Sequence, residues 1–182
     1  MSAPSEEDVS NVLDACRYGD LDDVNAFLSS FSGPVLAAAR DDRGNSALHM
    51  AAANGHVDVL QLLLPLFASY DVPNESGSTP LHWAALNAQM DATKLLVESE
   101  RGGVKLIDVA NKAGRTPLAE AELAGWDEGA RWMVDKMDLE EAPPALDTDE
   151  PVPEGDEGDE DDVTERVAAV TIDEDDKTLT KS

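Results

Sequence analysis

Basic side chains are scarce in this chain. Its 182 residues contain 13 lysines and arginines against 39 aspartates and glutamates, which gives a formal net charge of −26. A protein that binds nucleic acid by neutralising phosphates needs clustered basic side chains, so this composition excludes that class of binder. Anionic lipid would repel the same charge, and we therefore expect no docking on a membrane surface either.

Cysteine and long apolar runs are also nearly absent. Cys16 is the only cysteine, so the chain can form no internal disulfide and fits a reducing compartment. No stretch reaches the length of about 18 apolar residues that predicts a transmembrane helix. The segment Met1–Asp8 is acidic, where a secretory signal would be basic and then apolar. We expect a protein of the cytoplasm and nucleus.

The acidic charge is concentrated at the C-terminal end. Residues 1–137 carry 21 acids and 10 bases, a net −11, whereas residues 138–182 carry 18 acids and 3 bases, a net −15. The second segment has no aromatic residue and four prolines, so it cannot bury enough apolar surface to offset chain entropy. We predict a disordered acidic tail over 138–182 and a flexible acidic segment over 1–8.

One sequence pattern recurs four times between these segments. Its copies are Asn11–Asp20, Ser46–His56, Thr79–Gln89 and Thr116–Trp126. Their equivalent positions are Gly19, Gly55, Ala88 and Gly125, which lie 36, 33 and 37 residues apart. This period, with a Thr-Pro-Leu-His-x-Ala core, is the signature of ankyrin repeats.

Each copy also has the signals of a helix pair. Thr79–Pro80 and Thr116–Pro117 place a hydroxyl at a helix N-cap and a proline at the first helical position. Apolar residues recur at i, i+3 and i+4 over 57–64 and 90–97, which predicts a second helix with one buried stripe. We predict an all-α ankyrin-repeat solenoid of four helix-turn-helix repeats over 9–137, with repeats at about 9–40, 41–73, 74–110 and 111–137.

The polar, glycine-containing segments between helix pairs predict projecting loops. In a solenoid of this kind, such loops and the first helices line the concave side, which is the usual binding face. The exposed positions predicted there are Arg17, Tyr18, Asp42, Arg43, Asn45, Ala53, Asn54, Glu75, Ser76, Ser78, Trp83, Leu86, Asn87, Lys112 and Arg115.

No residue pattern predicts catalysis or a cofactor. A zinc site needs three or four convergent ligands, and the sequence has one cysteine and no paired metal-binding motif. His49, His56 and His82 fall on repeat positions, so we interpret them as structural. Cys16 occupies a slot that is alanine in the next two copies, which predicts a small buried residue.

Three tryptophans have roles that the sequence leaves partly open. Trp83 replaces the usual leucine of a first helix, and is either core or a half-exposed anchor for a partner. Trp126 and Trp132 lie in the last copy, where covering the open end of the stack is the simpler role.

Beyond the general repeat, the chain resembles a family of fungal ankyrin-repeat chaperones. Their client is the small-subunit ribosomal protein that has number three in the standard naming. The likeness is carried by Ala47–His56, by Leu81–Asn87 with its tryptophan, by Leu13–Asp22 and by the acidic tail. Ala88–Gln89 and Pro65 depart from the pattern.

This resemblance implies a non-catalytic monomer that binds a newly made, basic ribosomal protein and shields it during small-subunit biogenesis. An acidic escort would mask the client's charge before it meets RNA. The alternative is a generic ankyrin adaptor or regulator that docks one signalling or transcription partner, with a tail that only keeps the protein soluble.

Overall fold

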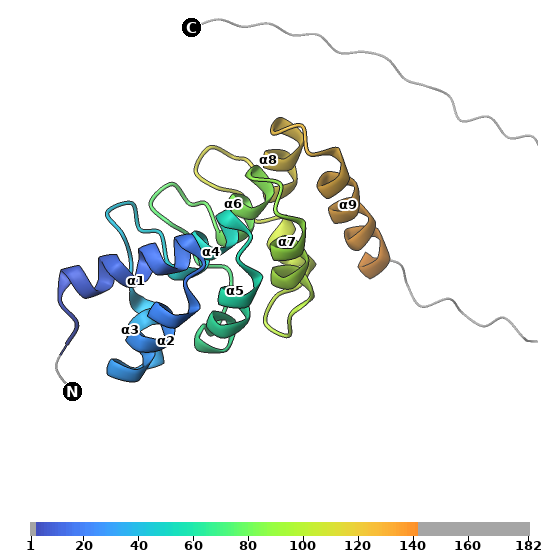
Figure 1. Cartoon of the computed structure of the whole chain (residues 1–182). Coiled ribbons are helices and arrows are strands. Elements are labelled where there is room, and N and C mark those ends of the chain that lie inside the picture. The colour runs from blue at the N-terminus through green and yellow to red at the C-terminus, as the bar shows by residue number, and fades with distance from the viewer. Residues whose placement is uncertain (1–2, 142–182) are drawn as a thin grey trace, which may run out of the picture. The chain divides into compact units, whose positions relative to one another are not determined.

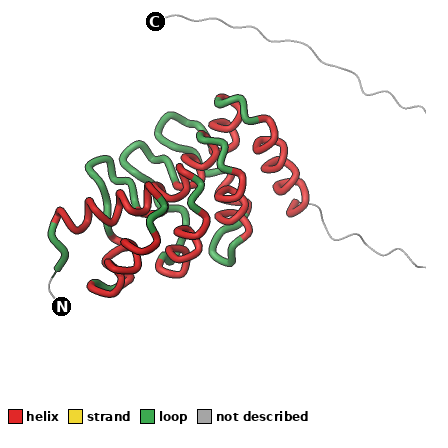
Figure 2. Tube along the Cα trace, viewed as in Figure 1, coloured by secondary structure: helices red, strands yellow, loops and turns green. Residues whose placement is uncertain are grey.

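The computed structural model describes residues 3–141, which lie within one compact unit, Met1–Ala145. Residues 1–2 and 142–182, and with them most of the predicted tail, lie outside the described residues. The helices of the described part are α1 (Glu6–Tyr18), α2 (Leu21–Ser30), α3 (Gly33–Ala38), α4 (Ala47–Asn54), α5 (Val57–Leu63), η1 (Leu64–Leu66), α6 (Pro80–Leu86), α7 (Met90–Glu98), η2 (Val104–Ile107), α8 (Pro117–Leu123) and α9 (Asp127–Glu141). Over 3–141 there is no strand (Figure 2).

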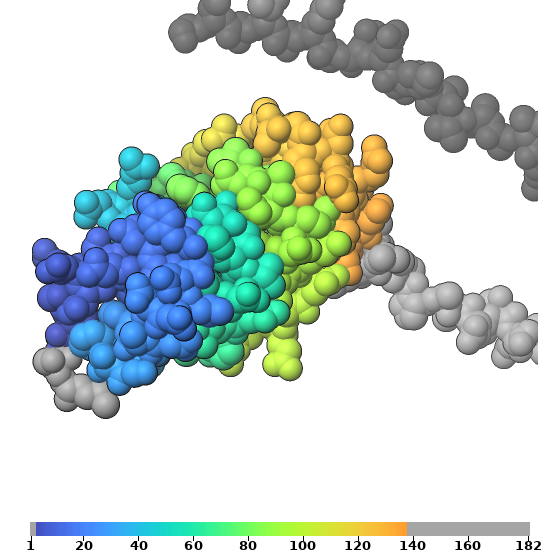
Figure 3. Space-filling view, viewed as in Figure 1, coloured from blue at the N-terminus to red at the C-terminus, as the bar shows by residue number. Residues whose placement is uncertain are grey.

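The helices form four stacked pairs. We call α1, α4, α6 and α8 the inner helices, since each packs against the next along the stack, and α2, α5, α7 and α9 the outer helices (Figure 1). In the space-filling view, successive pairs form adjacent bands from blue to orange (Figure 3). The predicted all-α solenoid of four repeats is confirmed.

Small side chains let the inner helices approach one another. Ala51, Ala84 and Ala121 are fully buried at equivalent positions of α4, α6 and α8. Leu48 and Leu81 are also buried, at the position that the pattern assigns to the core. Cys16 is fully buried, and burial raises the pKa of its thiol to about 12, so it acts as the predicted small core residue.

The first helix begins earlier than the sequence predicts. α1 begins at Glu6, inside the segment 1–8 that we expected to be flexible. Ser5 and Asp8 form a capping box: the Asp8 N–H donates to Ser5 Oγ at 3.1 Å and the Ser5 N–H donates to Asp8 Oδ2 at 2.8 Å. The acidic residues of this segment therefore start the first repeat. At the other end, α9 continues to Glu141, past the predicted boundary at 137.

The turns between inner and outer helices use the left-handed backbone region. Gly19, Gly55 and Gly125 have φ of 78°, 72° and 73°, and Ala88 takes φ 54° at the same place in the third pair. A Cβ at Gly19 would approach the His56 ring to 2.6 Å, so the first turn requires glycine. Ala88 accepts the left-handed conformation at a cost of about 1–2 kcal/mol.

Two buried histidines, one in α4 and one in α6, each connect their own helix to the next loop. His49 Nδ1 accepts the Ser46 N–H at 3.1 Å, so its proton sits on Nε2, which donates to the Ser78 carbonyl at 2.9 Å. His82 repeats the arrangement, with the Thr79 N–H at 3.1 Å and the Arg115 carbonyl at 3.0 Å. The structural interpretation of these histidines is confirmed, and His56 likewise contacts the Arg17 carbonyl at 2.8 Å.

The two tryptophans of the last helix pair pack against the core at the C-terminal end of the described stack. Trp126 and Trp132 are half-buried and pack against the core. Lys136 lies 5.5 Å from the centre of the Trp132 ring and pairs with Glu98 at 2.6 Å, which fastens α9 to α7. The predicted capping role of these two tryptophans agrees with this packing.

Thr93 offers a direct test of the outer-helix packing. Its side chain is fully buried in α7, and its hydroxyl has no hydrogen-bond partner among the described residues. Thr93→Val removes this unsatisfied group at nearly constant volume, so we expect unfolding to cost about 1 kcal/mol more in urea denaturation. Thr93→Ala, which also removes the methyl group, is the control and should destabilise the protein.

The buried histidines predict a loss of stability in acid. Burial lowers the pKa of His49 to about 4 and also lowers the pKa of His82. A group whose folded pKa is depressed stabilises the fold above its ordinary value of about 6.5, and this contribution is lost as pH falls toward the folded value. We expect roughly 2 kcal/mol of His49-dependent loss between pH 7.5 and pH 5 in urea denaturation. In His49→Gln, which keeps a side-chain acceptor, the loss should be clearly smaller; an unchanged pH profile would contradict the assignment.

Candidate partner-binding surface

Three projecting loops lie side by side along the inner helices (Figure 1). We call them finger loops 1, 2 and 3, at residues 41–45, 74–78 and 111–115. Their backbones are hydrogen-bonded to one another: the Glu75 N–H donates to the Arg43 carbonyl at 3.0 Å, and the Lys112 N–H donates to the Ser76 carbonyl at 2.9 Å. The three loops therefore present one continuous edge.

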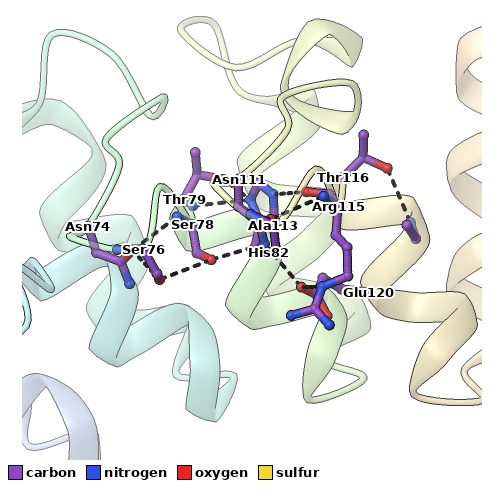
Figure 4. A network of polar contacts seen from close by, with 11 residues as sticks. Asn74, Ser76, Ser78, Thr79, His82, Asn111, Ala113, Arg115, Thr116 and Glu120 are labelled. Atoms are coloured by element: carbon purple, nitrogen blue, oxygen red, sulfur yellow. Dashed lines mark hydrogen bonds and ion pairs between the residues drawn. The ribbon is translucent and has the colours of Figure 1, made fainter.

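The first residue of each finger loop fixes the shape of that loop. Asn74 Oδ1 accepts the N–H groups of Ser76 and Ser78 at 3.0 and 2.9 Å. Asn111 Oδ1 accepts the N–H groups of Ala113 and Arg115 at 3.0 and 3.1 Å (Figure 4). These bonds occupy the side chain that would otherwise be available to a ligand, so the two asparagines are structural.

Asn45 is not part of the exposed binding face that we predicted. Only 3% of it is exposed, and its amide donates to Asp41 Oδ2 at 2.9 Å while its Oδ1 accepts from Asn74 at 2.8 Å. Asn45 therefore joins finger loop 1 to finger loop 2. A buried amide of this kind holds two loops together and is unavailable to a partner.

Most of the other predicted positions are accessible. The exposed ones are Arg17, Tyr18, Asp42, Arg43, Asn54, Glu75, Ser76, Leu86, Asn87, Lys112 and Arg115, and the half-buried ones are Ala53, Ser78 and Trp83. The amides of Asn54 and Asn87 donate to the carbonyls of Met50 and Trp83, each at 2.9 Å, so they also brace the ends of α4 and α6. As binding residues, the accessible positions stay predictions.

Tyr18 lies apart from the finger loops. It is 73% exposed and lines a hollow of about 540 Å³ between α1 and α2, together with Phe27 and Phe31. The two phenylalanine rings pack with centroids 4.7 Å apart. The structure therefore does not bring Tyr18 together with the other predicted site residues.

Two hollows lie where the finger loops meet the inner helices. The first, of about 590 Å³, lies between α1 and finger loop 1 and is polar: its lining includes Glu6, Asp14, Arg17, Arg40, Asp41, Asp42 and Met50. The second, of about 450 Å³, lies between α6, α8 and the finger loops 2 and 3. It is lined by Ser76, Ser78, Trp83, Leu86, Arg115, Glu120, Leu123 and Ala124.

The second hollow has an apolar floor. Leu86 and Leu123 are 49% and 68% exposed, which makes them two of the large apolar side chains that the described residues leave open to solvent. Trp83 lines the same hollow and is half-buried, with its ring edge-on to the His49 ring at a centroid distance of 6.5 Å. Trp83 therefore packs against a buried residue and also keeps part of its side chain exposed to a partner. It combines the core role and the anchor role that the sequence leaves open.

A buried acid forms one wall of the same hollow. Glu120 is 5% exposed, and its Oε1 accepts from Arg115 Nε at 2.9 Å and from Asn111 Nδ2 at 3.1 Å (Figure 4). Sequence reasoning missed Glu120 and Leu123. The signal was present, because they stand 37 residues after Trp83 and Leu86, the spacing between the third and fourth copies.

Charge changes sign along the edge that the finger loops form. Loop 1 has two acids and one base, loop 2 has one acid and no base, and loop 3 has two bases and no acid, so the net charges are −1, −1 and +2. Opposite signs at the two ends of one surface favour a partner with a matching arrangement of charges.

Metal-binding clusters and membrane-spanning helices are both absent from the part of the chain that the structure describes. Over 3–141, no group of three or more histidine, cysteine, aspartate or glutamate side chains is placed to hold a metal ion. In the same range, no helix has both the length and the apolar character needed to cross a bilayer.

Known proteins share both the sequence pattern and the fold. A family model of ankyrin repeats (three copies) matches residues 12–108 and 66–142. The ankyrin repeat-containing protein P16F5.05c of Schizosaccharomyces pombe is 40% identical over 58 residues, which is 32% of this chain and 38% of that protein. The ankyrin repeat-containing protein YAR1 of Saccharomyces cerevisiae is 35% identical over 147 residues, 74% of this chain and 72% of that protein.

A solved structure extends the likeness to three dimensions. In the crystal structure of the yeast ribosomal protein Rps3 in complex with its chaperone Yar1, the matching chain has a TM-score of 0.69 and 30% sequence identity. The match covers 77% of this chain and 99% of that one. With the repeat pattern, the stacked helix pairs and the family match in agreement, this chain belongs to the ankyrin-repeat family.

Proposed function

We propose that this chain is a dedicated chaperone that binds and shields a newly made small-subunit ribosomal protein of the Rps3 kind. The observation that carries the proposal is the 30% identity and 0.69 TM-score to a chain of the Rps3–Yar1 complex, together with 35% identity to YAR1 over 74% of this chain. The role is one of protein binding without catalysis, exercised in the cytoplasm and nucleus by a monomer that carries one client.

The charge of the chain supports this function. A ribosomal protein outside the ribosome carries the positive charge that it uses to bind RNA, so it associates indiscriminately with other polyanions. A partner with a net charge of −26 competes with those polyanions and attracts the client over a long range. A neutral adaptor would lack this effect.

The concave side of the stack supplies the contact surface. It combines the polar first hollow, the apolar second hollow and the exposed edge of the finger loops. Apolar side chains that are half-exposed in the free protein gain most when a partner covers them. We therefore assign most of the binding affinity to the second hollow. The long-range attraction that speeds association is assigned to the acidic groups.

The acidic tail provides a first test. Attraction between exposed charges decays over about 10 Å at 0.1 M salt, so the tail acts mainly on association. Removal of residues 142–182 should slow association with purified Rps3 about tenfold at low salt and have little effect at high salt, with a nearly constant dissociation rate in stopped-flow measurements. An association rate insensitive to both salt and tail, or tighter binding of acidic proteins than of Rps3, would favour the generic adaptor.

The second hollow provides a separate test. The double substitution Leu86→Ser and Leu123→Ser should weaken Rps3 binding by about 2 kcal/mol, or roughly 30-fold, in isothermal titration calorimetry. Val134→Ser is the matched control, because Val134 is 40% exposed on α9, away from this hollow. Equal effects of the two changes would place the client on a different face.

A further inference from the structure

We propose that the second hollow binds an acidic side chain of the client beside an apolar one, and that Arg115 is the residue that selects this acid. The inference rests on the proposed function, since the acid belongs to the client. It assigns a specific chemistry to one part of the concave surface: the hollow prefers a carboxylate, although the client as a whole is basic.

The charge of finger loop 3 is the first reason. Lys112 and Arg115 give this loop a net +2, in a chain whose net charge is −26. A surface built only to attract a basic protein would be acidic here too, as finger loops 1 and 2 are. The cationic end of the edge therefore fits a different group from the one that the acidic end fits.

The orientation of Arg115 is the second reason. Its Nε donates to Glu120 Oε1 at 2.9 Å, and this carboxylate is held in turn by Asn111 Nδ2 at 3.1 Å (Figure 4). Glu120 is buried, with 7% of its side chain exposed, while 49% of the Arg115 side chain is exposed. Glu120 is thus a positioning residue that holds the guanidinium in the wall of the hollow.

The free edge of the guanidinium is the third reason. Within residues 3–141, Glu120 is the one acidic side chain paired with Arg115, through Nε, so the edge formed by the two Nη nitrogens can face a partner (Figure 4). Two parallel N–H groups on one edge match the two oxygens of a carboxylate in a bidentate pair. The Arg115 backbone is also held on both sides, since its carbonyl accepts from His82 Nε2 at 3.0 Å and its N–H donates to Asn111 Oδ1 at 3.1 Å.

The apolar floor makes such a pair strong and selective. Leu86, Leu123 and Trp83 line the same hollow as Arg115. A client segment that covers them would exclude water from the guanidinium, and a charge-assisted hydrogen bond is worth more once it is desolvated. An uncharged polar side chain at the same place would leave the guanidinium without its matching charge.

The same geometry sets the direction of the bound segment. The acidic and apolar residues of the client lie at α6, α8 and finger loop 3, and its basic residues point toward the acids of loops 1 and 2, which include Asp42 and Glu75. The reverse orientation would put like charges together at both ends, which is unfavourable.

The test compares variants of the full chain for binding to purified yeast Rps3 by isothermal titration calorimetry. Arg115→Ala combined with Glu120→Gln removes the cation without leaving a buried charge unpaired, which protects the fold. We expect this variant to bind about tenfold more weakly. Arg115→Lys keeps the charge but loses the two-pronged geometry, and should bind several-fold more weakly.

Arg131→Ala is the matched control, because it removes one exposed positive charge from α9, away from the finger loops and the hollow. It should change the affinity by less than about twofold. Thermal unfolding of each variant, together with Glu120→Gln alone, separates an effect on binding from an effect on folding. A purely structural role for Arg115 would lower stability and leave the affinity of the folded protein unchanged.

A double-mutant cycle between this chain and Rps3 identifies the client's acidic residue that pairs with Arg115. Each aspartate and glutamate of Rps3 is changed singly to its amide, and each variant is titrated with the wild-type chain and with the Arg115→Ala, Glu120→Gln variant. We expect one client position at which the loss due to Arg115 disappears. Equal affinities of the Arg115 and Arg131 variants, or an Arg115 loss that persists with every amide variant, would overturn the inference. Failure of the wild-type chain to bind Rps3 would overturn the proposed function as well.

Discussion

The rest of the structure depends on one kind of hydrogen bond. It joins a buried histidine of an inner helix to a carbonyl in the following finger loop. His49 and His82 each accept a backbone N–H at the start of their own helix and donate across to the next loop. Each ring thus sets helix start, loop position and repeat spacing together. Because Nδ1 needs its lone pair to accept the backbone N–H, the complete arrangement requires the neutral imidazole, and burial of both rings favours that form.

This constraint turns a stack of short helices into a binding surface. Inner helices of seven or eight residues, such as α4 and α6, are too short to be stable alone, so their neighbours and loops must hold them. Once the finger loops are linked, the hollow beside Trp83 exists before any partner arrives. Binding then costs little conformational entropy in this protein, and most of the ordering cost falls on the client.

The sequence patterns correctly predicted the positions that recur in each repeat. They failed for residues whose environment is particular to one copy. Leu48, Leu81 and the capping residues follow the period, so their burial and roles could be predicted. Asn45 was misplaced because a polar loop residue normally faces solvent, and its bond to Asn74 depends on the contact between two loops 29 residues apart. Glu120 was missed because burial of an acid depends on Arg115 and Asn111 folding over it.

Hydrogen exchange of the full chain, alone and with Rps3 bound, tests the central claim most directly, because it reports which face the client covers without changing any residue. The account predicts slower exchange in finger loops 2 and 3 and in the last turns of α6 and α8, with α5 and α7 unchanged. Protection confined to the outer helices, or no protection at the finger loops in the presence of saturating Rps3, would contradict it.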